Sequence, residues 1–316
     1  MRYEGGKAEV STQGKYEIIH DTINKVDSLL SVSIMCEIAG VSRSGYYAWK
    51  KAAPLRELRE ESDRKDFEII LEAYKFRGYA KGARGIFMRM LHTGVRMNLK
   101  KIRRLMKKYG LKCPYRGPNP YRQMAKALKT NTVFPNIVNR EFVKGGIRKV
   151  LLTDITYISY DGGVCYLSTI LDAFTREILA YEVSLSLTVD FVLKTVDELV
   201  VNHGCSLDDT TIVHSDQGCH YTSKAFIAKI RDKSLIQSMS RKGNCWDNAP
   251  QESFFGHMKD EIKYEISMMK CFTDVKHKID DWIDYYNNDR YQWELAKLSP
   301  KEYYTYETTG VYPINV

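Results

Sequence analysis

Three acidic residues in the second half of the chain could together carry out phosphoryl transfer. Asp154 interrupts an apolar run, Asp216 directly follows another, and Glu252 opens a segment of helical periodicity. A buried aspartate is costly unless it is paired or holds a metal. Carboxylates are preferred ligands of Mg²⁺, and two such ions roughly 3.5–4 Å apart would activate an attacking hydroxyl and stabilise a leaving oxygen. The three residues are therefore candidate metal ligands.

The segment around Glu252 indicates the start of a helix. Asn248 can cap this helix, and Pro250 suits an early helical position. Lys259 follows Glu252 by seven residues, so two helical turns return it to nearly the same face. We therefore expect a carboxylate and a cation on one face of this helix. An aspartate at the end of a strand, such as Asp216, is by itself more often a turn or cap residue.

The rest of this half predicts the elements that would position these side chains. Segments with alternating apolar residues or many β-branched residues indicate strands, and apolar residues at helical spacing indicate helices. Strands are expected at 150–160, 164–171, 177–184, 210–214 and 234–239, with a hairpin turn at 161–163 and helices at 187–203, at 223–232 and around Glu252. A meander of three strands followed by alternating helices and strands predicts a mixed sheet covered by helices.

The N-terminal half is expected to be helical. Residues 31–50 indicate a helix, a glycine turn and a second helix, in which Gly40 supplies the left-handed residue and Ser42 caps the second helix. This is the outline of a helix-turn-helix whose second helix, with Arg43, would face DNA. An ordinary helical hairpin is the commoner structure with this pattern. A charged helix is expected at 55–76.

A second unit of the same kind is predicted at residues 78–111. One helix is expected at 82–91, and Asn98 should cap another at 99–109, which Gly110 ends. An apolar stripe on this second helix leaves its basic residues outside, available to DNA phosphates. These basic residues are Lys100, Lys101, Arg103, Arg104, Lys107 and Lys108.

The charge is distributed unevenly. Residues 1–149 contain 32 lysines and arginines against 14 aspartates and glutamates, whereas residues 150–316 contain 16 against 25. Residues 75–149 contain 21 basic residues and one acidic residue. A single basic cluster is often a solvated surface, but so long a one-sided segment favours nucleic acid as partner. Residues 113–149, with four prolines and no helical period, predict a cationic linker along DNA or a tether without specific function.

Composition sets the remaining expectations. The length of 316 residues and the 44% hydrophobic content predict two or three domains with a sizeable core. The seven cysteines form no CxxC pair, which favours reduced thiols over a disulfide framework or a zinc knuckle. No apolar segment is long enough to span a bilayer, so a soluble, cytoplasmic protein associated with the nucleoid is expected.

Taken together, these motifs resemble the Asp-Asp-Glu triad of the retroviral-integrase superfamily, in the form found in bacterial insertion-sequence transposases of the OrfB type. The three acidic residues are separated by 62 and 36 positions. The resemblance covers about residues 31–305, although Gln292 stands where many relatives have His, and residues 1–30 match nothing. The local motifs that carry it are 153–157 (TDITY), 214–218 (HSDQG), 221–223 (YTS), 243–249 (GNCWDNA) and 252–255 (ESFF).

The resemblance implies a ribonuclease-H-like mixed sheet flanked by helices and preceded by all-α helix-turn-helix-type domains. Its expected parts are an N-terminal extension (1–30), a helix-turn-helix-like region (31–74), a second basic domain (75–112), a basic linker (113–149), a catalytic core (150–270) and a C-terminal helical region (271–316). Trp246 and a stripe containing Trp282, Ile283 and Tyr286 are expected to be core residues.

The resemblance also implies an activity, namely cleavage at the 3′ ends of an insertion element followed by strand transfer. Asp154, Asp216 and Glu252 would bind two Mg²⁺ or Mn²⁺ ions, and Lys259 would contact phosphate near the element end. Asn244 and Asn248 would shape a loop that holds DNA. The expected partners are double-stranded DNA at the element ends and the target, and further copies of the chain.

Two alternatives remain at this point. Related transposases often gain an upstream DNA-binding segment by fusion with a first reading frame, and we expect this chain to lack that segment. The chain could therefore be a non-catalytic DNA-binding subunit that requires a first-frame partner protein. The same carboxylates would also serve a nuclease of the ribonuclease-H type, although the helix-turn-helix-like units and the shared face of Glu252 and Lys259 argue against it.

Overall fold

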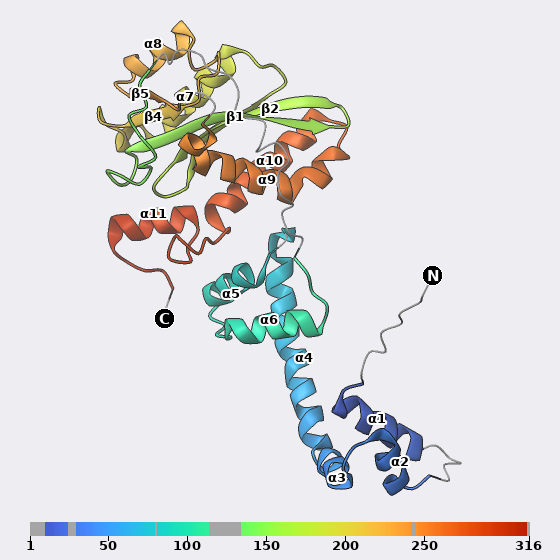
Figure 1. Ribbon diagram of the computed structural model, residues 1–316. Helices are drawn as coiled ribbons and strands as arrows, with labels where there is room; N and C mark the ends of the chain where they lie inside the picture. The colour runs from blue at the N-terminus through green and yellow to red at the C-terminus, as the bar shows by residue number, and fades with distance from the viewer. Residues whose placement is uncertain (1–9, 25–29, 80, 114–133, 242–243, 315–316) are drawn as a thin grey trace. The chain divides into compact units, whose positions relative to one another are not determined.

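The computed structural model describes residues 10–24, 30–79, 81–113, 134–241 and 244–314. The chain forms two compact units, Met1–Ile69 and Ile70–Val316 (Figure 1). Most of the predicted basic linker, residues 114–133, lies outside the described residues, as does Gly243 of the motif that precedes Glu252. Within the described part of the chain, no helix is both long and apolar enough to cross a membrane.

The first unit contains the predicted helix, glycine turn and helix. Helix α2 (Val32–Ala39) ends at Gly40, which has a φ of 64°, and helix α3 (Arg43–Lys51) follows. The hydroxyl of Ser42 accepts a hydrogen bond from the backbone N–H of Gly45 at 3.1 Å and so caps α3. The roles predicted for the glycine and the serine are therefore confirmed.

The first unit also contains a helix that was not predicted from the sequence. Helix α1 (Thr12–Ile23) lies within the segment 1–30, to which no element was assigned. Its buried residue Ile19 packs with Cys36 and Tyr46 in one small core. Few apolar residues mark α1, so it becomes recognisable only through the partners that it covers. The helical region therefore begins upstream of residue 31.

Helix α4 (Ala53–Lys75) runs from the first unit into the second, and a 3₁₀ turn η1 (Phe76–Gly78) follows it. Helices α5 (Ala83–His92) and α6 (Leu99–Lys108) come next. The Asn98 side chain accepts a hydrogen bond from the backbone N–H of Lys100 at 2.8 Å, which confirms the predicted cap. On α6 Ile102, Leu105 and Met106 are buried and Leu99 is half-buried. The basic residues of α6 lie outside or at the edge, as expected from their spacing.

A five-stranded mixed sheet forms the centre of the second unit. Its strands are β1 (Val150–Tyr160), β2 (Gly163–Asp172), β3 (Ile178–Ser184), β4 (Ile212–Ser215) and β5 (Ile236–Met239), in the order β3-β2-β1-β4-β5. The pairs β1–β2 and β2–β3 are antiparallel, whereas β1–β4 and β4–β5 are parallel. The predicted mixed sheet is confirmed, because the meander gives the antiparallel part and the helical crossovers give the parallel part.

Helices cover both faces of this sheet (Figure 1). Leu151 of β1 packs in a core with residues of α7 (Val189–His203) and α8 (Lys224–Asp232). Leu152, which points to the other face, packs with residues of α9 (Ala249–Ser267) and α10 (Phe272–Asn288). Short 3₁₀ turns η3 (Gly204–Ser206) and η4 (Cys245–Asn248) precede β4 and α9, and α11 (Pro300–Thr309) is the last helix described.

The two predictions about tryptophans have opposite outcomes. Trp282, Ile283 and Tyr286 are buried between α9 and the sheet, which confirms them as core residues. Trp246 was also expected in the core, but this prediction is wrong, because 63% of its surface is exposed. Trp246 lies in the short turn η4, where the neighbouring residues Asp247 and Asn248 take the buried positions instead.

Candidate active site

Sheet pairing brings two of the three predicted acidic residues to neighbouring positions. Asp154 lies in the middle of β1, and Asp216 directly follows the last residue of β4. The parallel pairing of these strands sets Leu152 against His214. Continued by two residues, this register sets Asp154 against Asp216. Glu252 lies in the first turn of α9, which packs on β1.

The charges of these residues act on Asp154 together. Burial is the main cause that raises the pKa of Asp154 to about 7, and the negative charges of Asp216 and Glu252 act in the same direction. The cation Lys259 opposes them. Burial lowers the pKa of Lys259, while the charge of Asp154 raises it. The structure therefore brings Asp216, Glu252 and Lys259 within electrostatic reach of the Asp154 carboxyl group.

Local hydrogen bonds orient the two aspartates. The backbone N–H of Ile155 donates to Asp154 Oδ1 at 2.7 Å, and the backbone N–H of Gly218 donates to Asp216 Oδ1 at 2.8 Å. A β-carbon on residue 218 would lie 2.9 Å from the same Asp216 oxygen, closer than such contacts normally come. The glycine therefore leaves room for the Asp216 carboxylate directly after the strand.

Asn248 takes a different role from the one predicted. It occupies the N-cap position of α9, but its side chain makes no capping hydrogen bond there. Its Nδ2 instead donates to Asp154 Oδ2 at 3.4 Å. The Asn248 side chain is buried, and the acidic residue that it contacts, Asp154, belongs to the candidate site. The start of α9 is thereby linked to the middle of β1.

Asp247 was not predicted, although it fixes the loop before α9. Its carboxylate is buried and accepts hydrogen bonds from Asn136 Nδ2 at 2.9 Å, from Arg140 Nε at 2.8 Å and from the backbone and side chain of Arg241 at 2.8–3.0 Å. Burial alone would raise the pKa of Asp247, but the hydrogen bonds from Arg241 and Arg140 hold it well below its usual range. Three chain segments therefore meet at one charged residue.

Only part of this arrangement has a signal in the sequence. Arg241 stands six residues before Asp247 within the same loop, so an ion pair between them could have been anticipated. Arg140 is 107 residues upstream and gives no local signal. Asn244, predicted to shape a loop that holds DNA, accepts a hydrogen bond from Arg140 Nη2 at 3.0 Å. Asn244 therefore belongs to the loop that Asp247 and Arg140 hold in place.

The predicted DNA-binding residues lie in separate places. Arg43 is exposed at the start of α3 in the first unit. The six basic residues of α6 belong to the second unit, where Lys101 is half-buried and the other five are exposed. The part of α6 that faces away from its apolar stripe is therefore strongly cationic.

The donor chemistry of the site suits a hard divalent cation, although the side chains do not form a ready-made cage. In the described ranges, no three His, Cys, Asp or Glu side chains form a group that could hold a metal ion. The acidic residues nevertheless supply oxygen ligands only, which Mg²⁺ prefers. The negative charges of Asp216 and Glu252 raise the pKa of Asp154, and a cation bound beside these groups would offset this repulsion.

Family models match most of the described chain. A model described as an integrase core domain matches residues 148–245, and a second integrase core domain model matches residues 233–300. A model described as an HTH-like domain matches residues 61–119. The sheet and the acidic site therefore lie in an integrase core, and helices precede it.

Proteins with similar sequences show to which family this integrase-core protein belongs. The chain is 33% identical to an "uncharacterized transposase-like protein" of Haemophilus influenzae, over 68% of this chain and 96% of that one. It is 30% identical to a 31 kDa protein of insertion element IS600 from Shigella sonnei (84% and 96%), and 27% identical to the putative transposase InsK for IS150 of Escherichia coli (89% and 96%). The chain belongs to the family of bacterial insertion-sequence transposases.

Solved structures give a weaker likeness. The catalytic core domain of BIV integrase superposes with a TM-score of 0.41 at 15% identity, over 52% of this chain and 98% of that one. The family assignment rests on the relatives and the family models.

Proposed function

We propose that this chain is a DNA transposase that cleaves the 3′ ends of an insertion element and joins them to target DNA. The main observation behind this proposal is that several charges act on Asp154. Burial raises the pKa of Asp154 to about 7, and the negative charges of Asp216 and Glu252 act in the same direction. Membership of the transposase family supports DNA as the substrate. A half-buried carboxyl group whose pKa is raised to about 7 beside further acidic residues is typical of a catalytic site.

Asp154, Asp216 and Glu252 would hold one or two Mg²⁺ or Mn²⁺ ions. When bound, such ions supply Lewis-acid stabilisation of the attacking and leaving oxygens of a phosphodiester. Asp154 would bind a cation in its deprotonated form, so its proton must leave first. Asn248 and the backbone N–H of Ile155 orient this carboxylate from opposite oxygens. Asp216 is exposed, so incoming substrate would reach its carboxylate without a change of the fold.

Basic residues would hold the DNA around this site. Lys259 shares the face of α9 with Glu252 and would contact a phosphate next to the reacting bond. The cationic side of α6 would bind further phosphates, because its basic residues lie along one helix. Arg43 would contact DNA through the helix-turn-helix-like region of the first unit. Several copies of the chain would assemble on paired element ends.

Substitution of the acidic residues tests this proposal. With Mg²⁺ and a duplex carrying the element end, Asp154→Asn or Glu252→Gln should reduce cleavage and joining at least about a thousandfold, because metal-supported charge stabilisation contributes several kcal/mol. The matched control Asp209→Asn changes an exposed aspartate and should leave activity unchanged. All variants should still bind the duplex. Full activity in either site variant would refute the proposal.

A further inference from the structure

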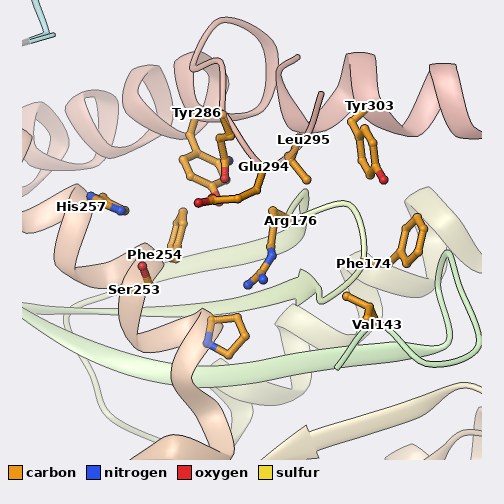
Figure 2. A pocket seen from close by; sticks show the side chains of 12 residues that line it. Val143, Phe174, Arg176, Ser253, Phe254, His257, Tyr286, Glu294, Leu295 and Tyr303 are labelled. Atoms are coloured by element: carbon orange, nitrogen blue, oxygen red, sulfur yellow. The ribbon is translucent and has the colours of Figure 1, made fainter. Parts of the chain in front are cut away.

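A cavity lies on the side of α9 that faces away from Glu252. Its volume is about 330 Å³, and its walls come from the turn between β2 and β3, from α9 and from the chain between Tyr286 and Tyr303. Figure 2 shows Arg176 in the middle of the lining side chains, in this view between Phe254 and Phe174. The volume is in the range of pockets that bind small ligands.

Arg176 is held in place by the turn that carries it. Its φ of 64° is in the left-handed region, which is uncommon for a residue with a side chain and requires support from the surrounding structure. Asp172 gives this support. Its backbone carbonyl accepts from the N–H of Arg176 at 2.8 Å, and its carboxylate accepts from the N–H of Phe174 at 3.2 Å and from the hydroxyl of Thr175 at 2.8 Å.

The charge of Arg176 is not used within the turn. A second arginine, Arg148, already pairs with Asp172 at 3.2 Å and with Glu177 at 2.6 Å, so the acidic residues of the turn are occupied. Within the described residues, the Arg176 guanidinium makes no hydrogen bond or ion pair, although its charge acts on Tyr286. A strained, half-buried arginine that faces a cavity is therefore oriented in advance for a ligand.

The walls of the cavity select the kind of ligand. Phe174 lies nearly parallel to Tyr303 with ring centroids 6.0 Å apart, and Phe254 meets Tyr286 edge to face at 4.8 Å. These rings offer flat apolar surface. Arg176 donates hydrogen bonds, whereas the lining residue Glu294 accepts them. The carboxylate of Glu294 disfavours a bare phosphate, and the guanidinium disfavours a hydrocarbon.

A nucleobase matches this combination. Unpaired bases are bound by stacking on aromatic rings and by hydrogen bonds to their donor and acceptor edges. The cavity is also close enough to the acidic residues to receive a base of the same strand. Helix α9 separates Glu252 from the cavity, and a helix with its side chains is about 10 Å across. A strand covers this distance in about three nucleotides at a spacing of roughly 3.4 Å.

We propose that the cavity beside Arg176 binds one unpaired nucleobase of a DNA strand whose phosphodiester lies at Asp154, Asp216 and Glu252. Arg176 donates to the edge of the base, and the aromatic walls stack on its face. The source of the base, a strand under cleavage, rests on the proposed function. The binding of a base by the cavity is independent of cleavage.

Binding of the full chain to a synthetic strand in EDTA tests this inference. The probe is a short, fluorescently labelled strand of abasic sugar-phosphate units with one central base, and the reference is the same strand without the base. Fluorescence anisotropy should show about tenfold tighter binding of the probe, since base stacking on aromatic side chains gives roughly 1–3 kcal/mol per base. Each of the four bases is tested in turn.

Two variants assign this difference to the cavity. Arg176→Asn removes the guanidinium but tolerates the left-handed backbone, and Phe174→Leu removes one aromatic wall at similar bulk. Both should reduce the preference for the base to less than about threefold while leaving affinity for the abasic strand unchanged. The control Arg231→Asn removes an exposed charge from α8, on the opposite face of the sheet, and should keep the preference.

The outcomes separate this inference from the proposed function. Equal binding of the two strands, or a preference that survives both cavity variants, would overturn the inference even if the chain cleaves DNA. A preference lost in Arg176→Asn and Phe174→Leu would support it even if no cleavage is found. Lower affinity of Arg176→Asn for both strands alike would show a phosphate contact and would also overturn it.

Discussion

Two aspartates on neighbouring strands differ in how the fold compensates their charge, although both are acidic side chains with a raised pKa. Asp154 lies on β1 and Asp172 on β2, and burial is the main cause that raises the pKa of both. Asp172 is paired with Arg148 and accepts hydrogen bonds from its own turn. Asp154 has an amide partner and a backbone donor, but two further carboxylates add to its negative surroundings.

The difference lies in where the compensating charge comes from. For Asp172 the compensating charge is built into the fold, because Arg148 is buried beside it. For Asp154, the charges of the nearby carboxylates outweigh that of Lys259, so neutralisation requires a proton or an ion from solution. A buried carboxylate without internal compensation costs stability, and such a cost is typical of functional sites. The following predictions test this contrast.

The largest expected effect is on stability. Asp172→Asn should lower the free energy of unfolding by about 3 kcal/mol, because breaking a buried pair leaves the Arg148 charge without its full partner. Asp154→Asn should leave it unchanged or raise it in EDTA at pH 8, because it removes a buried charge repelled by its neighbours. Urea denaturation of the full chain measures both. Equal losses in the two variants would remove the proposed distinction.

A smaller effect is expected at Asp247, which we infer to be a positioning residue. Asp247→Asn should reduce cleavage about thirtyfold, because hydrogen bonds to a charged group contribute roughly 1.5–3 kcal/mol each. The Mg²⁺ concentration needed for half-maximal activity should rise, because Asn248 and Glu252 follow this loop directly.

Asp197→Asn is the matched control for Asp247, since Asp197 forms an ion pair with Lys229 at 2.7 Å on the other side of the sheet. The control should leave the Mg²⁺ requirement unchanged. A loss of stability in Asp247→Asn without a change in the Mg²⁺ requirement would show that Asp247 has only a structural role.

The pH dependence of the site should follow Asp154. The pKa of Asp154 is about 7 in the folded chain, above its ordinary value of 3.8. Between about pH 4 and pH 7 the folded state therefore keeps a proton on Asp154 that the unfolded state has lost. In EDTA, stability should therefore fall as pH rises from about 4 to 7, and Asp154→Asn should remove this fall. Below pH 7, Mg²⁺ affinity should drop about tenfold per pH unit at most, because binding displaces the proton.

The smallest expected effect is at Asn248. Its contact with Asp154 is long, at 3.4 Å, so Asn248→Ala should reduce cleavage only about threefold, the usual size of one neutral hydrogen bond. Asn248→Asp should have a larger effect, because it adds a fourth carboxylate and raises the pKa of Asp154 further. A titration of Mg²⁺-dependent cleavage against pH would show this shift, and identical profiles for the two variants would contradict the electrostatic account.

The sequence predicted those parts of the fold that depend on local pattern. The bounds predicted for β1 agree with the structure, and Ser42 and Asn98 cap the helices for which they were proposed, because alternation and capping act over a few residues. Asp154 lies in the middle of β1 and Asp216 directly follows β4, as the predicted strands indicated. The roles assigned to the acidic residues remain predictions.

Other features could not be predicted because they depend on residues far apart in the chain. Helix α1 is defined by the small core that it completes, and Trp246 is exposed because Asp247 takes the buried position near it. The contact between Arg140 and Asp247 joins residues 107 positions apart. The cavity beside Arg176 is likewise formed by four segments that are far apart in the chain.

The shared carboxylate of Asp247 also has an evolutionary consequence. Arg140 and Arg241 lie in different segments, yet both donate to it. A change of Asp247 alone would remove the shared acceptor of two arginines, whose side chains are 45% and 50% exposed. Once Asp247 has been replaced in a lineage, both arginines have lost the contact that selects for them, so further changes at their positions are expected to follow. Among descendants of one ancestor, positions 140, 241 and 247 should behave as a single inherited character.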